Sequence, residues 1–335
     1  GILVTAALSS PTVKTVLGID IDNESITHCK KTIKDKRARF KHSEFFQAIN
    51  GAYDTMLCNP PYLPQERWDK DVTLYGGKEG QEFAERVVIE GNDHLELDGA
   101  VLIITSSHSN EKHFLETCGR HLLDVKALER KPMGLFETLT VWNVTKNDTR
   151  KELEQRGVKG LRFFAKGKRG MILVGAYKKK TIAIKIKNPT SWAVGSVHNE
   201  ATMLQLVNKN KIGPRFVFEL PNAVAYEFVQ GTYLGDAMGD SEENEYDSHT
   251  AKALGEELLR QCAILDALGV QKEEMHNPHK NAIVTPEGNL TLIDFERAKK
   301  RPNPKNNRQA LNYLSKLGLI TKEEAIARGE ELAKK

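Results

Sequence analysis

The run Asn59-Pro60-Pro61-Tyr62 has residue types and an order that suit one chemical task. It follows an apolar segment, residues 53–58, that is typical of a buried strand. Two consecutive prolines fix the backbone, so the Asn59 side-chain oxygen and the Pro60 carbonyl can accept hydrogen bonds from one planar –NH2 group. A nitrogen held in this way keeps its lone pair for attack on an electrophilic methyl group, and Tyr62 can stack on the flat acceptor. The alternative is a proline-rich turn with a packed tyrosine.

Asp20 is the first acid in a second short apolar run, residues 16–22, that ends in acids. In doubly wound sheets, ligands bind at the carboxyl ends of the strands. A carboxylate there can accept hydrogen bonds from both ribose hydroxyls of a nucleoside. The alternative is a helix cap, which is common for an acid after a strand.

Several features of the second half suit phosphate binding. Gly167 and Gly170 lie in a turn between two predicted strands, and glycines let backbone N–H groups approach phosphate oxygens. Lys185 ends an apolar strand, where its ammonium can hold the α and β phosphates. Glu200, on the following predicted helix, can pair with this lysine.

Two oxygen-bearing side chains complete this set. Asp294 follows the apolar run 290–293, and Asn281 precedes Asp294 by 13 residues. Carboxylate and amide oxygens are the ligands that Mg²⁺ prefers. The set therefore predicts an ATP site with Mg²⁺, although each member alone could be structural.

The order of strands and helices predicts two domains. Strands and helices alternate over residues 1–146, which predicts an α/β, Rossmann-like domain with a parallel, doubly wound sheet. The polar stretch 147–155 is expected to be a linker. Residues 156–335 indicate a strand-rich small lobe followed by a helix-rich large lobe, an α+β two-lobed arrangement. Residues 239–247 are acidic and are expected to form a loop.

Composition narrows the class of protein. Hydrophobic residues make up 39% and charged residues 28% of the chain, as in soluble globular proteins, and no segment resembles a signal peptide or a membrane span. The four cysteines are scattered without a Cys-x-x-Cys pair, which argues for a reducing, cytoplasmic setting. Residues 1–150 hold 19 basic and 22 acidic residues, and the remainder holds 30 and 23. The basic second half could meet phosphate or simply be a solvated surface.

Residues 1 to about 145 resemble the HemK group of methyltransferases, which use S-adenosylmethionine to methylate the glutamine of class I release factors. The resemblance rests on Asn59-Pro-Pro-Tyr-Leu-Pro, on Gly76-Gly-Lys-Glu-Gly and on Leu135-Phe-Glu-Thr-Leu. It implies that Asp20 binds the ribose, that Glu44 lies near the adenine, and that the Asn59 run holds the amide. A small zinc-binding activator protein, found with archaeal and eukaryotic relatives, is an implied partner.

The same resemblance implies a missing part. HemK enzymes hold the methionine portion of the cofactor with a Gly-rich loop between the first strand and the first helix. Gly1 corresponds to the last glycine of that loop and residues 2–8 to the helix, so the first strand and part of the loop are expected to be absent. We therefore expect the 335 residues to bind S-adenosylmethionine poorly or not at all.

Residues from about Phe163 to Leu319 resemble the atypical archaeal Ser/Thr kinases related to the RIO and lipopolysaccharide kinase groups. The best matches are Lys211-Ile-Gly-Pro-Arg, Tyr226-Glu-Phe-Val-Gln-Gly and Ile293-Asp-Phe-Glu-Arg-Ala. The resemblance places Glu227 in the hinge against adenine.

The catalytic loop departs from the usual kinase pattern, because it contains no aspartate five residues before Asn281, where His276 stands. The resemblance implies that Glu274 replaces it as the base that accepts the proton of the substrate hydroxyl. The alternative is a nucleotide-binding pseudokinase.

The sequence as a whole predicts a fusion of an amide-nitrogen methyltransferase with an atypical kinase, acting on protein substrates. One alternative is a nucleotide-binding module joined to an inactive methyltransferase remnant. Another is a nucleic-acid amino-methyltransferase whose basic half holds RNA; its binding would weaken steeply with salt. We favour a protein substrate because no segment clearly serves as a target-recognition domain for nucleic acid.

Overall fold

The computed structural model describes residues 1–66, 68, 71–167, 170–187, 197–238 and 248–333. The chain divides into two compact units, Gly1–Arg162 and Phe163–Lys335, and each is described by itself. The acidic loop expected at 239–247 lies outside the described residues.

The first unit alternates helices and strands, as its sequence predicts. Its helices are α1 (Ile2–Leu8), α2 (Asn23–Thr32), α3 (Glu82–Gly91), the 3-10 turn η1 (Asn92–His94), α4 (Glu111–Arg120) and α5 (Asp148–Gln155). Its strands are β1 (Val16–Asp20), β2 (Ala38–His42), β3 (Tyr53–Cys58), β4 (Leu63–Pro64), β5 (Tyr75–Gly77), β6 (Leu95–Ser106), β7 (Leu123–Pro132) and β8 (Thr138–Lys146).

The strands of the first unit form separate sheets. β1 pairs with β2 in parallel, and a four-stranded sheet has the order β3-β6-β8-β7. Within the described part of the chain, β1 and β3 are therefore each paired along one edge. The predicted parallel arrangement is correct for β1–β2 and β3–β6 but wrong for β8, which runs antiparallel to both β6 and β7. The short connection between β7 and β8 contains no crossover helix, so it can only form a hairpin.

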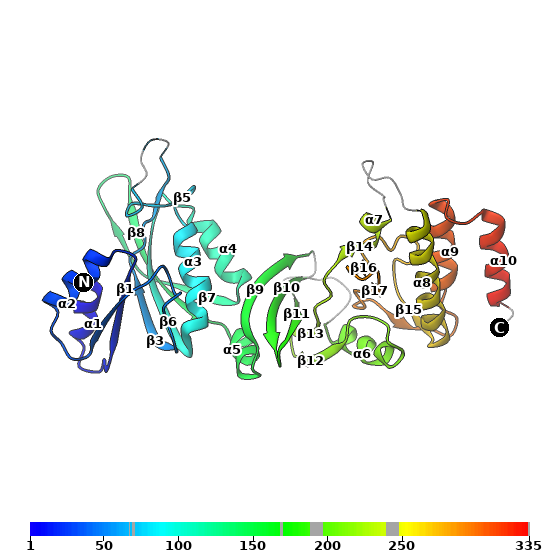
Figure 1. Cartoon of the computed structure of the whole chain (residues 1–335), viewed down its shortest axis with the longest axis horizontal. Helices are drawn as coiled ribbons and strands as arrows, with labels where there is room; N and C mark the ends of the chain where they lie inside the picture. The colour runs from blue at the N-terminus through cyan, green and yellow to red at the C-terminus, as the bar shows by residue number, and fades with distance from the viewer. Residues whose placement is uncertain (67, 69–70, 168–169, 188–196, 239–247, 334–335) are drawn as a thin grey trace. The chain divides into compact units, whose positions relative to one another are not determined.

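The core of the first unit lies between this sheet and the helices α3 and α4, which lie on one side of it in Figure 1. Val88, Ile103, Phe114 and Trp142 are among its buried side chains. The amphipathic spacing of α3 and α4 turns their apolar faces toward the sheet. This packing fixes the carboxyl end of β3, and the Asn59–Tyr62 run that is predicted to bind an amide begins directly after it.

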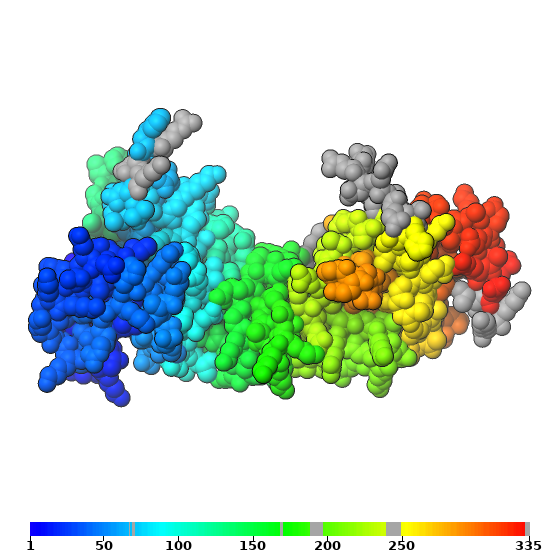
Figure 2. Space-filling view, in the orientation of Figure 1, coloured from blue at the N-terminus to red at the C-terminus, as the bar shows by residue number. Residues whose placement is uncertain are grey.

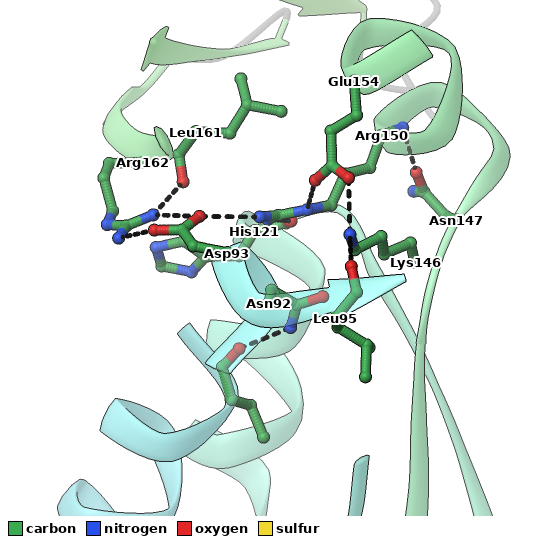
Figure 3. Close-up of polar contacts among 11 residues, drawn as sticks. Asn92, Asp93, Leu95, His121, Lys146, Asn147, Arg150, Glu154, Leu161 and Arg162 are labelled. Carbon is green, nitrogen blue, oxygen red and sulfur yellow. Dashed lines mark hydrogen bonds and ion pairs between the residues drawn. The ribbon is translucent and has the colours of Figure 1, made fainter. Parts of the chain in front are cut away.

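A buried arginine anchors α5, the helix that occupies most of the predicted linker. The Arg150 side chain is 1% exposed, and it donates to Glu154 Oε1 and to the His121 carbonyl, both at 2.8 Å (Figure 3). Glu154 Oε2 in turn accepts from Lys146 Nζ at 2.6 Å. Burial holds the pKa of Arg150 below its ordinary value, against the opposing charge of Glu154. Residues 148–155 are therefore a folded part of the first unit.

Asp93 extends this network to the strand that follows. It lies 3.8 Å from Arg150 Nη2 and accepts from Arg162 Nη1 at 3.2 Å (Figure 3). Arg162 belongs to β9 (Lys159–Lys166), so the beginning of β9 is held within the first unit. The two units consequently divide at residues 162–163, later than the boundary expected from the sequence.

Replacing Arg150 by alanine is expected to destabilise the first unit by about 3 kcal/mol, since it leaves a buried carboxylate with one cation fewer. The measurements are thermal unfolding and hydrogen exchange of the α5 amides. Arg156→Ala on the same helix is the matched control, because its ion pair with Glu152 is about half exposed and such pairs contribute about 0–1 kcal/mol. Equal losses in the two variants would contradict a structural role for the network.

The second unit begins with strands and ends with helices. Besides the second half of β9, its strands are β10 (Gly170–Tyr177), β11 (Lys180–Lys187), β12 (Phe216–Leu220), β13 (Ala223–Glu227), β14 (Thr232–Tyr233), β15 (Val270–Gln271), β16 (Ala282–Val284), β17 (Leu290–Leu292) and β18 (Lys299–Lys300). Its helices are α6 (Val197–Val207), the 3-10 turn η2 (Asn208–Asn210), α7 (Leu234–Ala237), α8 (Ser248–Ala267), α9 (Asn306–Lys316) and α10 (Lys322–Ala333).

A five-stranded sheet of order β12-β13-β11-β10-β9 forms the strand-rich part, and α6 packs against β12 and β13. The main core of the unit is helical, with buried residues of α8 and α9 packed around β16 and β17. The turn between β16 and β17 is exposed beside α8 (orange beside yellow in Figure 2). β17 thus runs from the surface into the unit and delivers Asp294 just after its end.

Among the residues that the structure describes, no helix has the length and apolar character that a membrane span requires.

Candidate functional site

The Asn59–Tyr62 run leaves the carboxyl end of β3 with its amide exposed and its prolines anchored. Asn59 is exposed, Pro60 is buried, and Pro61 and Tyr62 are half-buried. A buried proline followed by a second one fixes the chain direction. Because Asn59 is exposed, the amide of another molecule can reach its side chain from solvent.

The glycines of the 76–80 segment hold this run by close backbone contact. A Cβ on Gly76 would lie 2.2 Å from the Gly80 carbonyl oxygen and 2.4 Å from that of Pro61. Gly80 has φ +91°, and a Cβ there would lie 2.6 Å from the Tyr62 carbonyl oxygen. Only glycine fits these positions. Two of the three motifs that carry the methyltransferase resemblance, those beginning at Asn59 and Gly76, are thus parts of one substructure.

Glu79 ties the same segment to two helices. Its side chain accepts from Asn110 Nδ2 at 2.9 Å, and its backbone N–H donates to Glu82 Oε1 at 2.9 Å. The hydrogen bond from Asn110 is the main cause that lowers the pKa of Glu79. The sequence interpretation did not single out Asn110, although an asparagine just before a helix is a common N-cap, and its Oδ1 accepts from His113 N.

Asp20 and Glu44 follow neighbouring parallel strands. Asp20 ends β1 and is paired in register with His42 at the end of β2, so Glu44 lies two residues beyond that pair. Asp20 is exposed, and Asp22 rather than Asp20 caps α2. The alternative role of Asp20 as a helix cap is therefore excluded.

Two further cofactor candidates lie on the surface of the first unit. Glu44 forms a loose ion pair with Arg86 at 3.8 Å, which leaves its carboxylate half-exposed. Gly1 is exposed and stands at the N-cap position of α1.

In the second unit, one lysine gathers three carboxylates. Lys185 Nζ lies 2.8 Å from Glu200 Oε2, 2.9 Å from Asp294 Oδ1 and 2.8 Å from Glu296 Oε2. The structure thus brings together the predicted strand lysine, helix glutamate and terminal aspartate. Glu296 was missed by the sequence interpretation.

The charges of this cluster shift its titration. Burial works to lower the pKa of Lys185, but the carboxylates of Glu200 and Asp294 together raise it well above its ordinary value. Burial also raises the pKa of Glu200, and the negative charges of Asp294 and Glu296 add to that shift while Lys185 opposes it. Three acids share one ammonium, so the cluster carries an excess of negative charge that suits a cation.

The predicted base and the predicted amide ligand are in direct contact. Asn281 Nδ2 donates to Glu274 Oε2 at 2.9 Å, and the Asn281 carbonyl accepts from Ile293 N at 2.8 Å. Glu274 and Asp294 also have positive φ angles of +66° and +61°. Such strained backbone in residues other than glycine concentrates at functional sites. The hydrogen bond of Asn281 is thus made to Glu274, the predicted base, and not to His276.

The remaining nucleotide candidates lie on the five-stranded sheet. Gly167 N donates to the Gly170 carbonyl at 2.8 Å, and a Cβ on Gly170 would lie 2.1 Å from the Ile186 carbonyl oxygen. Glu227 ends β13, and its side chain pairs with Lys180 on the neighbouring strand.

The donor set fits magnesium. The carboxylates of Glu200, Asp294 and Glu296 offer oxygen atoms within 4.8 Å of one another. A donating Nδ2 on Asn281 leaves its amide oxygen as the acceptor that a metal would use. By contrast, a hollow of about 770 Å³ on the same unit contains none of these residues. It is lined by Thr202, Gln205, Leu206, Asn208, Lys209, Lys211, Gly213, Arg215 and Phe216.

Comparison with known proteins shows what the first part of the chain is similar to. Residues 1–130 match the family model for the methyltransferase small domain. A putative protein N5-glutamine methyltransferase of Methanocaldococcus jannaschii is 31% identical over 118 residues, which are 33% of this chain and 59% of that protein. A ribosomal protein uL3 glutamine methyltransferase of Bordetella pertussis is 29% identical over 33% of this chain and 41% of its own length.

A release factor glutamine methyltransferase of Aquifex aeolicus is 29% identical over 98 residues, 25% of this chain and 35% of that protein. The matched parts therefore span between a third and three fifths of these relatives.

Solved structures are only distantly similar. The E. cuniculi Mtq2–Trm112 complex, responsible for methylation of the eRF1 translation termination factor, gives a TM-score of 0.31 at 16% identity, over 44% of this chain and 94% of that one. A kinase domain gives 0.34 at 18% identity, over 42% and 51%. Scores this low carry no functional argument. The sequence matches carry more weight. They show that the N-terminal part of this chain is a methyltransferase-type α/β region similar to protein glutamine methyltransferases.

Proposed function

We propose that the first unit transfers a methyl group from S-adenosylmethionine to the amide nitrogen of a protein glutamine. The observation that carries this proposal is the exposed Asn59 amide on a proline-anchored turn, held by glycines 76 and 80. The Asn59 oxygen and the Pro60 carbonyl would accept hydrogen bonds from the substrate –NH2 group. Because those bonds orient the amide nitrogen toward the methyl group, positioning supplies the rate enhancement.

Three further residues of the first unit would bind the cofactor or the substrate. Asp20 would accept hydrogen bonds from the ribose and Glu44 would lie near the adenine, while Tyr62 would stack on the amide. The relatives' own substrates make a release factor or a ribosomal protein the first acceptors to test. A small zinc-binding protein is a further proposed partner.

Asn59→Ala should remove methyl transfer to glutamine, with a loss of at least about a hundredfold, because the amide loses an orienting acceptor. The assay follows tritium from labelled S-adenosylmethionine into a release factor, at millimolar cofactor so that weak cofactor binding does not limit the reaction. Asn50→Ala, an exposed asparagine before β3, is the matched control. Label on nucleic-acid amino groups, or equal transfer by Asn59→Ala, would contradict the proposal.

A second activity is proposed for the second unit: transfer of the γ-phosphoryl group of ATP to a hydroxyl group. The Lys185 cluster, with Asn281 bonded to Glu274, favours it. Lys185 would bind phosphate oxygens, and Glu274 would accept the proton of the attacking hydroxyl. Asp294 and Asn281 would hold Mg²⁺, which when bound neutralises the charge on the phosphates.

The experiment for this second activity is Mg²⁺-dependent ATP binding followed by transfer of labelled phosphate to the chain or to a generic protein acceptor. Binding with transfer supports a kinase. Binding without transfer supports the pseudokinase alternative, and no binding at millimolar ATP contradicts both.

A further inference from the structure

Three carboxylates surround the ammonium group of Lys185, and Nζ donates a hydrogen bond to Asp294 Oδ1. An ammonium group has three N–H donors, and oxygens of Glu200, Asp294 and Glu296 lie 2.8–2.9 Å from Nζ. A phosphate oxygen can therefore reach a donor of Lys185 only when one of these carboxylates withdraws.

Exposure decides which carboxylate can withdraw. The side chains of Glu200 and Glu296 are 2% and 7% exposed, whereas that of Asp294 is 42% exposed. When a buried carboxylate loses the cation that it is paired with, no water is available to stabilise its charge. Glu200 is also fixed by the hydrogen bond that its Oε1 accepts from Phe295 N at 3.3 Å. Asp294 is therefore the partner that exchanges.

Helix α6 holds Glu296 in place during that exchange. Asn199 Nδ2 donates to the carbonyls of Glu296 at 2.8 Å and Ala298 at 2.9 Å. The segment after Asp294 is thus bonded to the helix that carries Glu200. Both buried carboxylates stay on Lys185 while the aspartate moves.

We propose that Glu296 is a positioning residue that makes nucleotide binding depend on the metal, an inference that rests on the phosphotransfer function proposed above. When Asp294 turns to a divalent cation, Lys185 gains one N–H for a phosphate oxygen, and Glu200 and Glu296 keep its ammonium in place. Without the cation, three carboxylates surround the ammonium and their excess negative charge repels phosphate. Metal and nucleotide then bind cooperatively, because each raises the affinity for the other by the same factor.

The test is calorimetric affinity for ADP in Mg²⁺ and in EDTA. Mg²⁺ should tighten ADP binding to the wild type at least about tenfold. Glu296→Ala removes one carboxylate from the ammonium without metal, so ADP should bind more tightly in EDTA, and the Mg²⁺/EDTA affinity ratio should fall about tenfold. Glu296→Gln keeps an acceptor but removes the charge, so its ratio should fall to an intermediate value. Glu257→Gln, whose carboxylate bonds to Arg260 within α8, is the matched control.

An unchanged ratio in a folded Glu296→Ala variant overturns the inference while leaving nucleotide binding intact. If the alanine variant does not fold, an unchanged ratio in Glu296→Gln overturns it equally. Absence of ADP binding to the wild type in both media is a different result, because it defeats the phosphotransfer proposal and this inference with it.

Discussion

Asp294→Asn should lower phosphoryl transfer by about 10²–10³-fold, the usual loss when a single charge-stabilising group is removed from an active site. The neutral amide is a weaker ligand for Mg²⁺ than a carboxylate, so Mg²⁺-dependent ATP affinity should fall as well. The fold should survive, since Asp294 is 42% exposed and Lys185 keeps Glu200 and Glu296. Labelled-phosphate transfer and ATP calorimetry measure the two effects.

Glu274→Gln separates proton transfer from metal binding. A general base contributes about 10²–10⁴-fold, so this variant should lose transfer yet retain Mg²⁺-dependent ATP affinity. Asp98→Asn, with an 88% exposed side chain in the first unit, controls for the loss of one charge. Transfer at the wild-type rate by both Asp294→Asn and Glu274→Gln would remove these residues from the mechanism.

The sequence predicts the parts of the site that depend on local chemistry. Prolines 60 and 61 restrict the backbone, whereas glycines 76 and 80 allow close approach of other backbone atoms. Both effects follow from residue type. The order of Lys185, Glu200 and Asp294 along strand, helix and strand end predicts one cluster, and the structure brings them within 3 Å. The alternation of strands and helices likewise predicts the α/β class of the first unit.

Other features depend on through-space packing that the sequence does not encode locally. Glu296 is one example. Its backbone carbonyl is bonded to Asn199 of α6, and this tertiary contact accompanies the ion pair of its carboxylate with Lys185. The polar stretch 147–155 has the composition of a linker, yet Arg150 is buried because Glu154, Asp93 and the His121 carbonyl surround it. Burial of a charge is decided by its partners, which composition alone does not show.

Lys272 is a third feature of this kind, and its burial has a measurable cost in stability. Its side chain is among the largest that are fully buried, and its Nζ has no hydrogen-bond partner among the described residues. The face of the Phe295 ring lies 5.4 Å from Nζ. Burial lowers the pKa of Lys272 to about 8, although the charges of Asp294, Cys262, Glu200 and Glu274 oppose the shift.

The sign of the effect on stability follows from the two states. Lys272 titrates near pH 8 in the folded chain and near 10.5 in the unfolded chain. Below pH 8 both states carry the proton, and the folded state bears the full cost of a buried ammonium. Between pH 8 and 10.5 the unfolded state binds more protons, so stability rises with pH. Above 10.5 both states are neutral and the cost has gone.

Lys272→Met should therefore stabilise the second unit at pH 7 by on the order of 3 kcal/mol, the free-energy equivalent of this pKa difference. Methionine has a similar length and is flexible enough to fill the same space. The gain should shrink as pH rises toward 10.5, which urea unfolding at pH 6, 8 and 10 can follow. Lys209→Met, at an exposed lysine, should show neither the gain nor its pH dependence.

A loss of stability in Lys272→Met at pH 7 would mean that the ammonium has a compensating partner, and the argument from burial would be wrong. A gain in stability that is accompanied by slower phosphoryl transfer would have a different meaning. The Lys272 ammonium lies 5.4 Å from the Phe295 ring and interacts electrostatically with Asp294, Glu200 and Glu274, so its positive charge favours the ionised carboxylates. The second unit would then retain a destabilising buried charge because its proposed chemistry requires that charge.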